Sequence, residues 1–145
     1  MCINYLHMSK KFKAMVLSCM DPRFQPLVFN YLNKKGLKGK YSAFTIAGAA
    51  VGVTHNKFKK WHTAFIENLA TSIELHKIEK LIVINHRDCG AAKIANGKKE
   101  FSLANENHIH KTSFQSLKKI LKKKFPKLKV DFNLMGLDKK VQKFR

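Results

Sequence analysis

The fold is decided by residues 81–90, which read Leu-Ile-Val-Ile-Asn-His-Arg-Asp-Cys-Gly. The segment opens with a nearly continuous apolar run, which is typical of a strand covered on both faces in a parallel sheet. Two further short apolar runs lie upstream, at 14–18 and 41–46. The chain therefore has three predicted strands for the middle of a parallel sheet.

Segments with apolar residues at helical spacing separate these runs. The first lies at 27–32 and ends in Lys34-Lys35-Gly36, where cations followed by glycine suit a helix C-terminus. The second is a longer stripe between Lys57 and His76. The resulting alternation of strands and helices predicts an α/β sheet with right-handed crossovers.

The C-terminal third adds one more helix and one more strand. Residues 102–124 carry a stripe of Phe114, Leu117 and Leu121, and Pro126 stops this helix. Residues 128–134 alternate strictly between apolar and polar, which predicts a strand with one polar face. We expect a parallel-core β-sheet flanked by helices, with an antiparallel C-terminal edge strand, in a single domain over 1–145.

Composition restricts the class of protein. No stretch of ~18 apolar residues exists, and the first 13 residues lack the apolar region of a signal peptide, so we expect a cytoplasmic protein without membrane association. Three cysteines, an odd number without a secretion signal, favour metal binding or a reactive thiol over disulfides. Cys2, close to the terminus, is left out of the predicted site.

The net charge of +20 could attract nucleic acid, anionic membranes or small anions. However, 26 of the 29 basic residues are lysine, whereas arginine is the side chain suited to bidentate recognition. We expect no nucleic-acid binding beyond unspecific charge attraction. A noncatalytic nucleic-acid-binding protein is kept as one alternative.

Two short motifs follow predicted strands, where open α/β sheets place their ligands. Cys19-Met20-Asp21-Pro22-Arg23 follows the first strand, and His86-Arg87-Asp88-Cys89-Gly90 follows the third. Thiolate and imidazole suit Zn²⁺, so Cys19, His86 and Cys89 form a predicted ligand set. Three protein ligands leave a fourth position for water, as in a catalytic zinc site.

Asp21 and Arg23 are predicted to act beside the metal. Pro22 disfavours helix at Asp21, and an extended segment would project residues 19, 21 and 23 to the same side. Alone, the two charges could be a surface ion pair, and each cysteine a small core residue. The joint pattern at two strand ends favours the metal site.

The motifs Cys-x-Asp-x-Arg and His-x-x-Cys-Gly-Ala closely resemble the β-class carbonic anhydrases, from about Met15 to Ala92. The resemblance implies zinc bound by Cys19, His86 and Cys89, with Asp21 and Arg23 as the Asp-Arg pair. It also implies hydration of CO₂ to bicarbonate through zinc-bound hydroxide, and a homodimer. In some members of the family the aspartate takes the fourth zinc position and closes the site.

One departure from the family concerns the end of the second strand. The family usually has Arg-Asn-Ala-Gly there, whereas this chain reads Thr45-Ile46-Ala47-Gly48. A substrate pocket with a less polar wall would suit a sulfur-containing substrate. This motivates a second alternative, a zinc hydrolase acting on carbonyl sulfide or carbon disulfide. Gly48, Ala49 and Gly90 are the predicted substrate pocket, although 48–52 could equally be a plain turn.

The remaining histidines are candidates for proton shuttles or extra ligands, but a structural role is favoured for each; they are His7, His55, His62, His76, His108 and His110. His108 and His110 lie two residues apart in a predicted helix, so they should not share a face.

Overall fold

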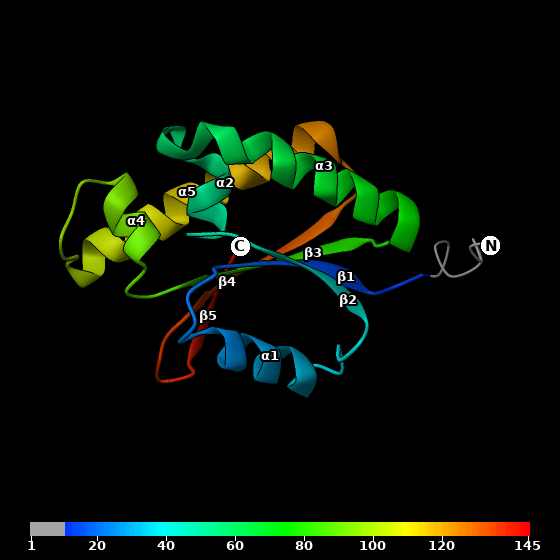
Figure 1. Cartoon of the computed structure of the whole chain (residues 1–145), viewed down its shortest axis with the longest axis horizontal. Helices are drawn as coiled ribbons and strands as arrows, with labels where there is room; N and C mark the ends of the chain where they lie inside the picture. The colour runs from blue at the N-terminus through cyan, green and yellow to red at the C-terminus, as the bar shows by residue number, and fades with distance from the viewer. Residues whose placement is uncertain (1–10) are drawn as a thin grey trace, which may run out of the picture.

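The computed structural model describes residues 11–145, which build a five-stranded sheet in the order β2-β1-β3-β4-β5 (Figure 1). Its strands are β1 (Ala14–Ser18), β2 (Tyr41–Thr45), β3 (Lys80–His86), β4 (Lys129–Met135) and β5 (Val141–Phe144). The first four are parallel, and β5 pairs antiparallel with β4. The predicted α/β class, with a parallel core and an antiparallel C-terminal edge strand, is confirmed. The edge strand is β5, which the sequence patterns did not reveal, whereas the predicted strand at 128–134 is β4 and pairs parallel with β3.

The helices cover the two faces of the sheet unequally (Figure 1). On one face lies α1 (Gln25–Lys34), and on the other lie α2 (Ala50–Thr54), α3 (Lys59–His76), α4 (Gly90–Ala95) and α5 (Leu103–Lys124). A short 3-10 helix, η2 (Asn56–Phe58), precedes α3. No helix within residues 11–145 is long and apolar enough to cross a membrane.

The apolar runs of β1 and β3 fill two core layers, because successive strand side chains point to opposite faces. Val16 and Ile82 belong to the layer under α1, together with Leu32. Leu17 and Val83 belong to the layer under α3 and α5. Burial on both faces explains why these strands read as continuous apolar runs rather than alternating ones.

The alternating apolar and polar residues of β4 correctly indicate an exposed polar face only in the first half of the strand. Lys129 and Asp131 are exposed, but Asn133 is 2% exposed and does not continue the predicted polar face. Its side chain donates a hydrogen bond to the Val83 carbonyl oxygen at 3.1 Å and accepts one from the Tyr31 hydroxyl at 3.4 Å. The end of β4 is covered on both faces, because Phe132 packs in the layer under α3 and α5 and Met135 packs in the layer under α1.

The strand order brings together the two segments that carry the predicted site. β1 and β3 are parallel neighbours, with Val16 beside Ile82. Parallel neighbours end at the same edge of a sheet, so the segments that follow them meet there. Cys19, which follows β1, can therefore share a site with His86 and Cys89, which lie at and after the end of β3.

Candidate metal centre

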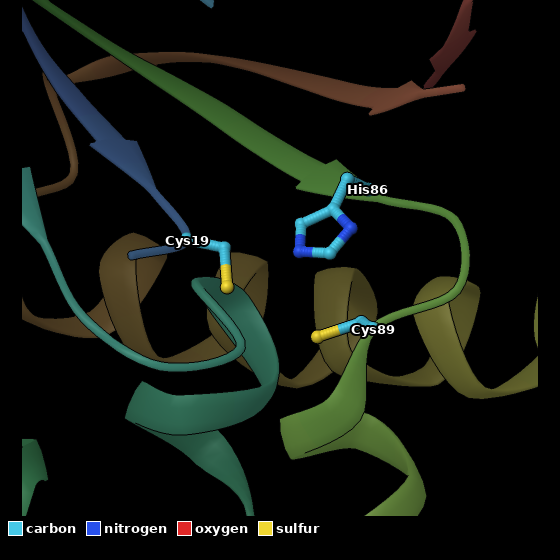
Figure 2. Close-up of side chains that lie close together, drawn as sticks. All are labelled: Cys19, His86 and Cys89. Carbon is cyan, nitrogen blue, oxygen red and sulfur yellow. The ribbon is translucent and has the colours of Figure 1, made fainter. Parts of the chain in front are cut away.

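Three buried side chains converge at the carboxyl edge of the sheet (Figure 2). Cys19 directly follows β1, His86 is the last residue of β3, and Cys89 precedes α4. They are 6%, 2% and 1% exposed, respectively. One ligand atom from each, two sulfurs and a ring nitrogen, lie within 4.8 Å of one another.

The orientation of the His86 ring leaves one nitrogen free to bind a cation. Nδ1 lies 2.7 Å from the Arg87 carbonyl oxygen, so Nδ1 carries the proton and Nε2 carries the lone pair. Nε2 is buried and has no hydrogen-bond partner among residues 11–145. The Phe24 ring stacks on the imidazole with centroids 4.0 Å apart. A buried, unpaired lone pair beside two sulfurs fits a metal ligand.

The two thiols perturb each other. The pKa of Cys19 is lowered, chiefly because the Cys89 thiol donates a hydrogen bond to its sulfur, with help from His86 and from the Gly48 N–H at 3.3 Å. The pKa of Cys89 is raised by the neighbouring Cys19 sulfur and by burial. A second thiolate beside the first is costly without a cation to balance both charges. The donor set therefore suits a soft or borderline divalent cation.

Asp21 and Arg23 meet beside this cluster, but not by the predicted extended path. Pro22-Arg23-Phe24 forms a turn, closed by the Phe24 N–H donating to the Asp21 carbonyl oxygen at 3.1 Å. The Arg23 N–H also donates to Asp21 Oδ1 at 2.9 Å. Proline is as well suited to the second position of a turn as to an extended chain, and here the turn prevails.

The Asp21 carboxylate is bound on both oxygens by the Arg23 guanidinium. Arg23 Nε donates to Oδ1 at 3.1 Å, and Nη2 donates to Oδ2 at 2.7 Å. Mainly through these bonds, Arg23 lowers the pKa of Asp21. Oδ2 lies 3.8 Å from His86 Nε2, so an ionised oxygen stands next to the cluster.

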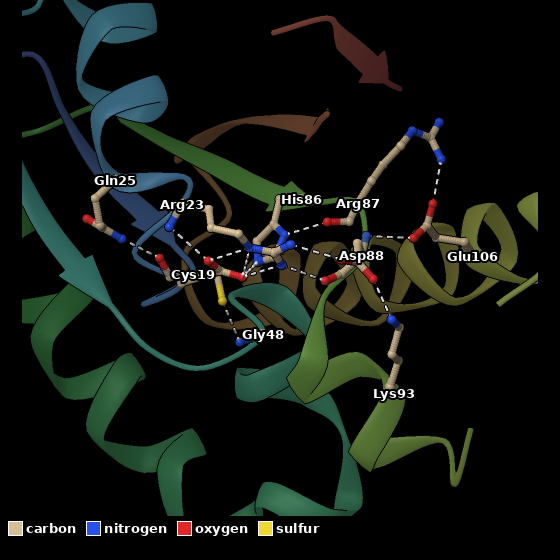
Figure 3. Close-up of polar contacts among 10 residues, drawn as sticks. Cys19, Arg23, Gln25, Gly48, His86, Arg87, Asp88, Lys93 and Glu106 are labelled. Carbon is tan, nitrogen blue, oxygen red and sulfur yellow. Dashed lines mark hydrogen bonds and ion pairs between the residues drawn. The ribbon is translucent and has the colours of Figure 1, made fainter. Parts of the chain in front are cut away.

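Arg23 also connects the two motifs (Figure 3). Its Nη1 donates to Asp88 Oδ2 at 2.9 Å, and its Nη2 donates to the Asp88 carbonyl oxygen at 3.1 Å. The other carboxylate oxygen of Asp88 pairs with Lys93 from α4. The guanidinium thus joins the segment after β1 to the segment after β3.

Of the three predicted pocket residues, Gly48 touches the cluster and Gly90 is adjacent to it in the chain. Gly48 contacts Cys19 through its N–H, and Gly90 opens α4 directly after Cys89. Ala49 is fully buried with a φ of 47°. Residues 50–54 form α2, so the segment 48–52 is more than a plain turn, and Ala50 to Val53 are buried as expected for a packed wall.

A second group of polar residues was not predicted. Asn85, just before His86, accepts a hydrogen bond from the Ala50 N–H at 3.0 Å and approaches His110 Nδ1 at 2.9 Å and Ser113 Oγ at 3.2 Å. Burial lowers the pKa of His110 to about 4. Glu106, one turn before His110 on α5, contacts the segment 87–88. Positions 106, 110 and 113 extend the apolar stripe at helical spacing, and that periodicity could have revealed them.

The other histidines do not join the cluster. His108 is exposed and His110 is buried, so the two do not share a face of α5, as predicted. His55, His62 and His76 lie in or beside η2 and α3 and bond locally or to Ser42. Cys2 and His7 lie outside the described residues.

A family model and a related sequence each match most of the chain. The model of a family described as "Putative carbonic anhydrase" matches residues 8–131. An uncharacterized protein of Rickettsia conorii is 29% identical over 126 residues, covering 86% of this chain and 68% of that protein.

Solved structures share the fold at low sequence identity. The β-carbonic anhydrase CafA of Aspergillus fumigatus matches with a TM-score of 0.58 and 12% identity, over 93% of this chain and 76% of that one. A tetrameric β-carbonic anhydrase of Sordaria macrospora matches with a TM-score of 0.55 and 14% identity, over 93% of this chain and 81% of that one.

Proposed function

The chain belongs to the "Putative carbonic anhydrase" family, and from this membership and the geometry of its site we propose that it reversibly hydrates CO₂ to bicarbonate with a zinc ion. The observation that carries the proposal is the buried Cys19, His86 and Cys89 cluster with an ionised Asp21 beside it. Zn²⁺ held by such a set acts as a Lewis acid that lowers the pKa of water from 15.7 to about 7.

Asp21 has the position and the charge to orient the attacking water. A carboxylate offers about four lone-pair sites, and Arg23 supplies three N–H donors, its backbone N–H, Nε and Nη2, so Oδ2 can accept one further hydrogen bond. Accepting the O–H of the water would fix the direction of its remaining lone pair, so that this lone pair could face the carbon of CO₂. Arg23 keeps the carboxylate ionised and holds it in place through both oxygens.

Metal content and CO₂ hydration, measured on the same preparation, test the proposal. Purified protein should contain about one zinc per chain and accelerate the pH change in a stopped-flow CO₂ assay. Cys19→Ser should abolish both, whereas Cys2→Ser, the matched removal of a thiol outside the predicted ligand set, should leave both unchanged. Bound zinc without hydration would contradict the proposed activity but would agree with the proposed metal site.

A second candidate function is hydrolysis of carbonyl sulfide or carbon disulfide. Ile46 packs its side chain against the apolar core, and the end of β2 carries neither the arginine nor the asparagine usual in the family. An apolar wall would suit carbonyl sulfide or carbon disulfide, which are linear like CO₂. Sulfide release from these substrates, with no hydration of CO₂, would favour that hydrolase.

We further propose that the chain assembles as a homodimer. The Sordaria macrospora structure with the same fold is tetrameric, which supports self-association as a starting hypothesis. Light scattering on purified protein should give a mass of twice the 16.7 kDa chain or a multiple of it. A single-chain mass at micromolar concentration would contradict it.

A further inference from the structure

One peptide group lies between the two motif residues His86 and Cys89 and is bonded at both ends. The Arg87 carbonyl oxygen accepts the hydrogen bond of His86 Nδ1 at 2.7 Å. The N–H of the same peptide group, that of Asp88, donates to Glu106 Oε2 at 2.8 Å. A buried carboxylate is therefore connected to the imidazole through a single peptide unit.

The carboxylate of Glu106 is fixed on its other side as well (Figure 3). Its Oε1 accepts a hydrogen bond from Arg87 Nη1 at 2.9 Å, and the side chain is 11% exposed. The first turn of α5 sets its position, because Ser102 caps this helix through Asn105 and the Glu106 N–H donates to the Ser102 carbonyl oxygen at 2.9 Å. Helix α5 thus presents a rigid anion to the segment 87–88.

The segment needs such an anchor, because Asp88 has a φ of 55°, in the left-handed region that residues with a Cβ rarely adopt. Glu106 holds its N–H, while Arg23 holds its carbonyl oxygen at 3.1 Å. The Glu106 contact holds the peptide group that faces His86, and the Arg23 contact holds the peptide group that follows it.

We propose that Glu106 is a positioning residue for the metal centre: by holding the Arg87–Asp88 peptide, it keeps His86 in the tautomer whose Nε2 lone pair faces Cys19 and Cys89. A ligand histidine commonly donates its second N–H to a carboxylate or a carbonyl, which fixes the ring and raises the basicity of the ligand nitrogen. Here the carboxylate acts through the carbonyl, since a charge on one side of a peptide polarises the hydrogen bond on the other. The inference rests on the proposed role of His86 as a metal ligand.

Zinc affinity is the first test, measured by competition with a chromophoric chelator. Glu106→Gln keeps the size of the side chain but removes its charge. The glutamine NH₂ group is a hydrogen-bond donor, so on one side of the side chain it would meet another donor and that hydrogen bond would be lost. We expect zinc affinity to fall about 10- to 100-fold, the range typical of such supporting residues. Asn107→Ala, which removes another Arg87 contact but none to the peptide, should change affinity less than about threefold.

A second readout requires no metal and no activity. In a Cys19→Ser background, which removes the neighbouring thiolate, ¹⁵N NMR at about pH 8 should find His86 with the proton on Nδ1. Adding Glu106→Gln should shift the population toward Nε2–H. A purely structural role would lower the melting temperature and leave the tautomer unchanged.

The outcomes separate this inference from the proposed function. Zinc affinity within threefold of the parent together with an unchanged tautomer in Glu106→Gln would overturn the positioning role. If Glu106→Gln does not fold, Glu106→Asp, which keeps the charge but shortens the reach, should lose affinity to a smaller degree, and unchanged affinity would again overturn it. If the parent binds no zinc, the proposed function fails, while the tautomer still decides the role of Glu106.

Discussion

Three N–H groups of Arg23 donate to the Asp21 carboxylate: the backbone N–H, Nη2, and Nε, whose hydrogen is shared between the two oxygens. The carboxylate is therefore held in place through both oxygens. Because Arg23 lowers its pKa, Asp21 remains ionised throughout the range in which CO₂ hydration would be assayed. The pair works as a unit at the edge of the cluster, with Oδ2 3.8 Å from His86 Nε2.

The role of Asp21 is tested by removing its charge. Asp21→Asn should lower the hydration rate by at least about 100-fold, the lower end of the range for removing one preorganised hydrogen-bonding group from an active site. Zinc content should stay near one per chain, because Asp21 is not one of the proposed ligands. Asp131→Asn, which removes a carboxylate paired with Lys80 on the exposed part of β4, is the control and should keep full activity. An unaltered rate in Asp21→Asn would contradict the proposed mechanism.

Burial of His110 predicts a pH dependence of stability. Its pKa in the folded protein is about 4, below the ordinary value of 6.5, so the unfolded chain takes up a proton that the folded chain does not. The free energy of unfolding should therefore fall as pH drops from about 6.5 to about 4, by on the order of 3 kcal/mol from this residue.

Urea unfolding of chelator-treated protein between pH 7 and pH 4.5 measures this contribution. His110→Gln cannot take up the proton, so its unfolding midpoint should depend less on pH than that of the parent. Parallel pH dependences in the two proteins would show that His110 titrates normally in the folded state.

At the scale of elements, continuous apolar runs were enough to predict β1 and β3, and apolar periodicity was enough to predict the long helices. These elements are buried on one or both faces, and burial of a face is what periodicity reports. The strand-end motifs could be placed for the same reason, because β1 and β3 could be recognised and their ends meet in a parallel sheet.

Contacts between polar residues far apart in the chain were not predictable in this way. Asn133 reads as an outward residue of an alternating strand, yet it bonds Val83 across the sheet. Glu106 reads as a charge near a helix start, yet its carboxylate is buried against Arg87 and Asp88. Each depends on a partner that only the tertiary fold supplies. The turn at Pro22 was missed because proline suits both turns and extended chain.

The wall formed by α2 depends on a glycine, and a matched pair of substitutions tests it. A Cβ at Gly52 would lie 2.1 Å from the Ala47 carbonyl oxygen, so Gly52→Ala forces the backbone apart. We expect a loss of at least about 2 kcal/mol in the free energy of unfolding.

Gly90→Ala is the control for this prediction. A Cβ at Gly90 would meet nothing within 4 Å, and alanine favours a helix by up to about 1 kcal/mol over glycine. This variant should be as stable as the parent or slightly more so in chemical denaturation of the metal-free protein. Equal stability of Gly52→Ala and Gly90→Ala would mean that the α2 wall is not closely packed.

At the scale of the whole molecule, the net charge of +20 has no counterpart in the proposed chemistry. Most of it is lysine, including a run at the end of α5. Such a charge should bind duplex DNA and heparin alike at low salt, with an affinity that falls steeply and is lost by about 150 mM salt. A filter-binding titration against salt would measure it. Retained, sequence-dependent DNA binding at that salt would instead favour the alternative of a nucleic-acid-binding protein.

Cys19, His86 and Cys89 come together only in the folded chain, and the proposed function depends on their binding of zinc. Anomalous scattering from a crystal, collected on both sides of the zinc absorption edge, tests it most directly. The expected result is one strong peak about 2.3 Å from the sulfurs of Cys19 and Cys89 and about 2.0 to 2.1 Å from Nε2 of His86. A crystal of zinc-supplemented protein with no peak among these three atoms, or with zinc only on surface histidines, would contradict it.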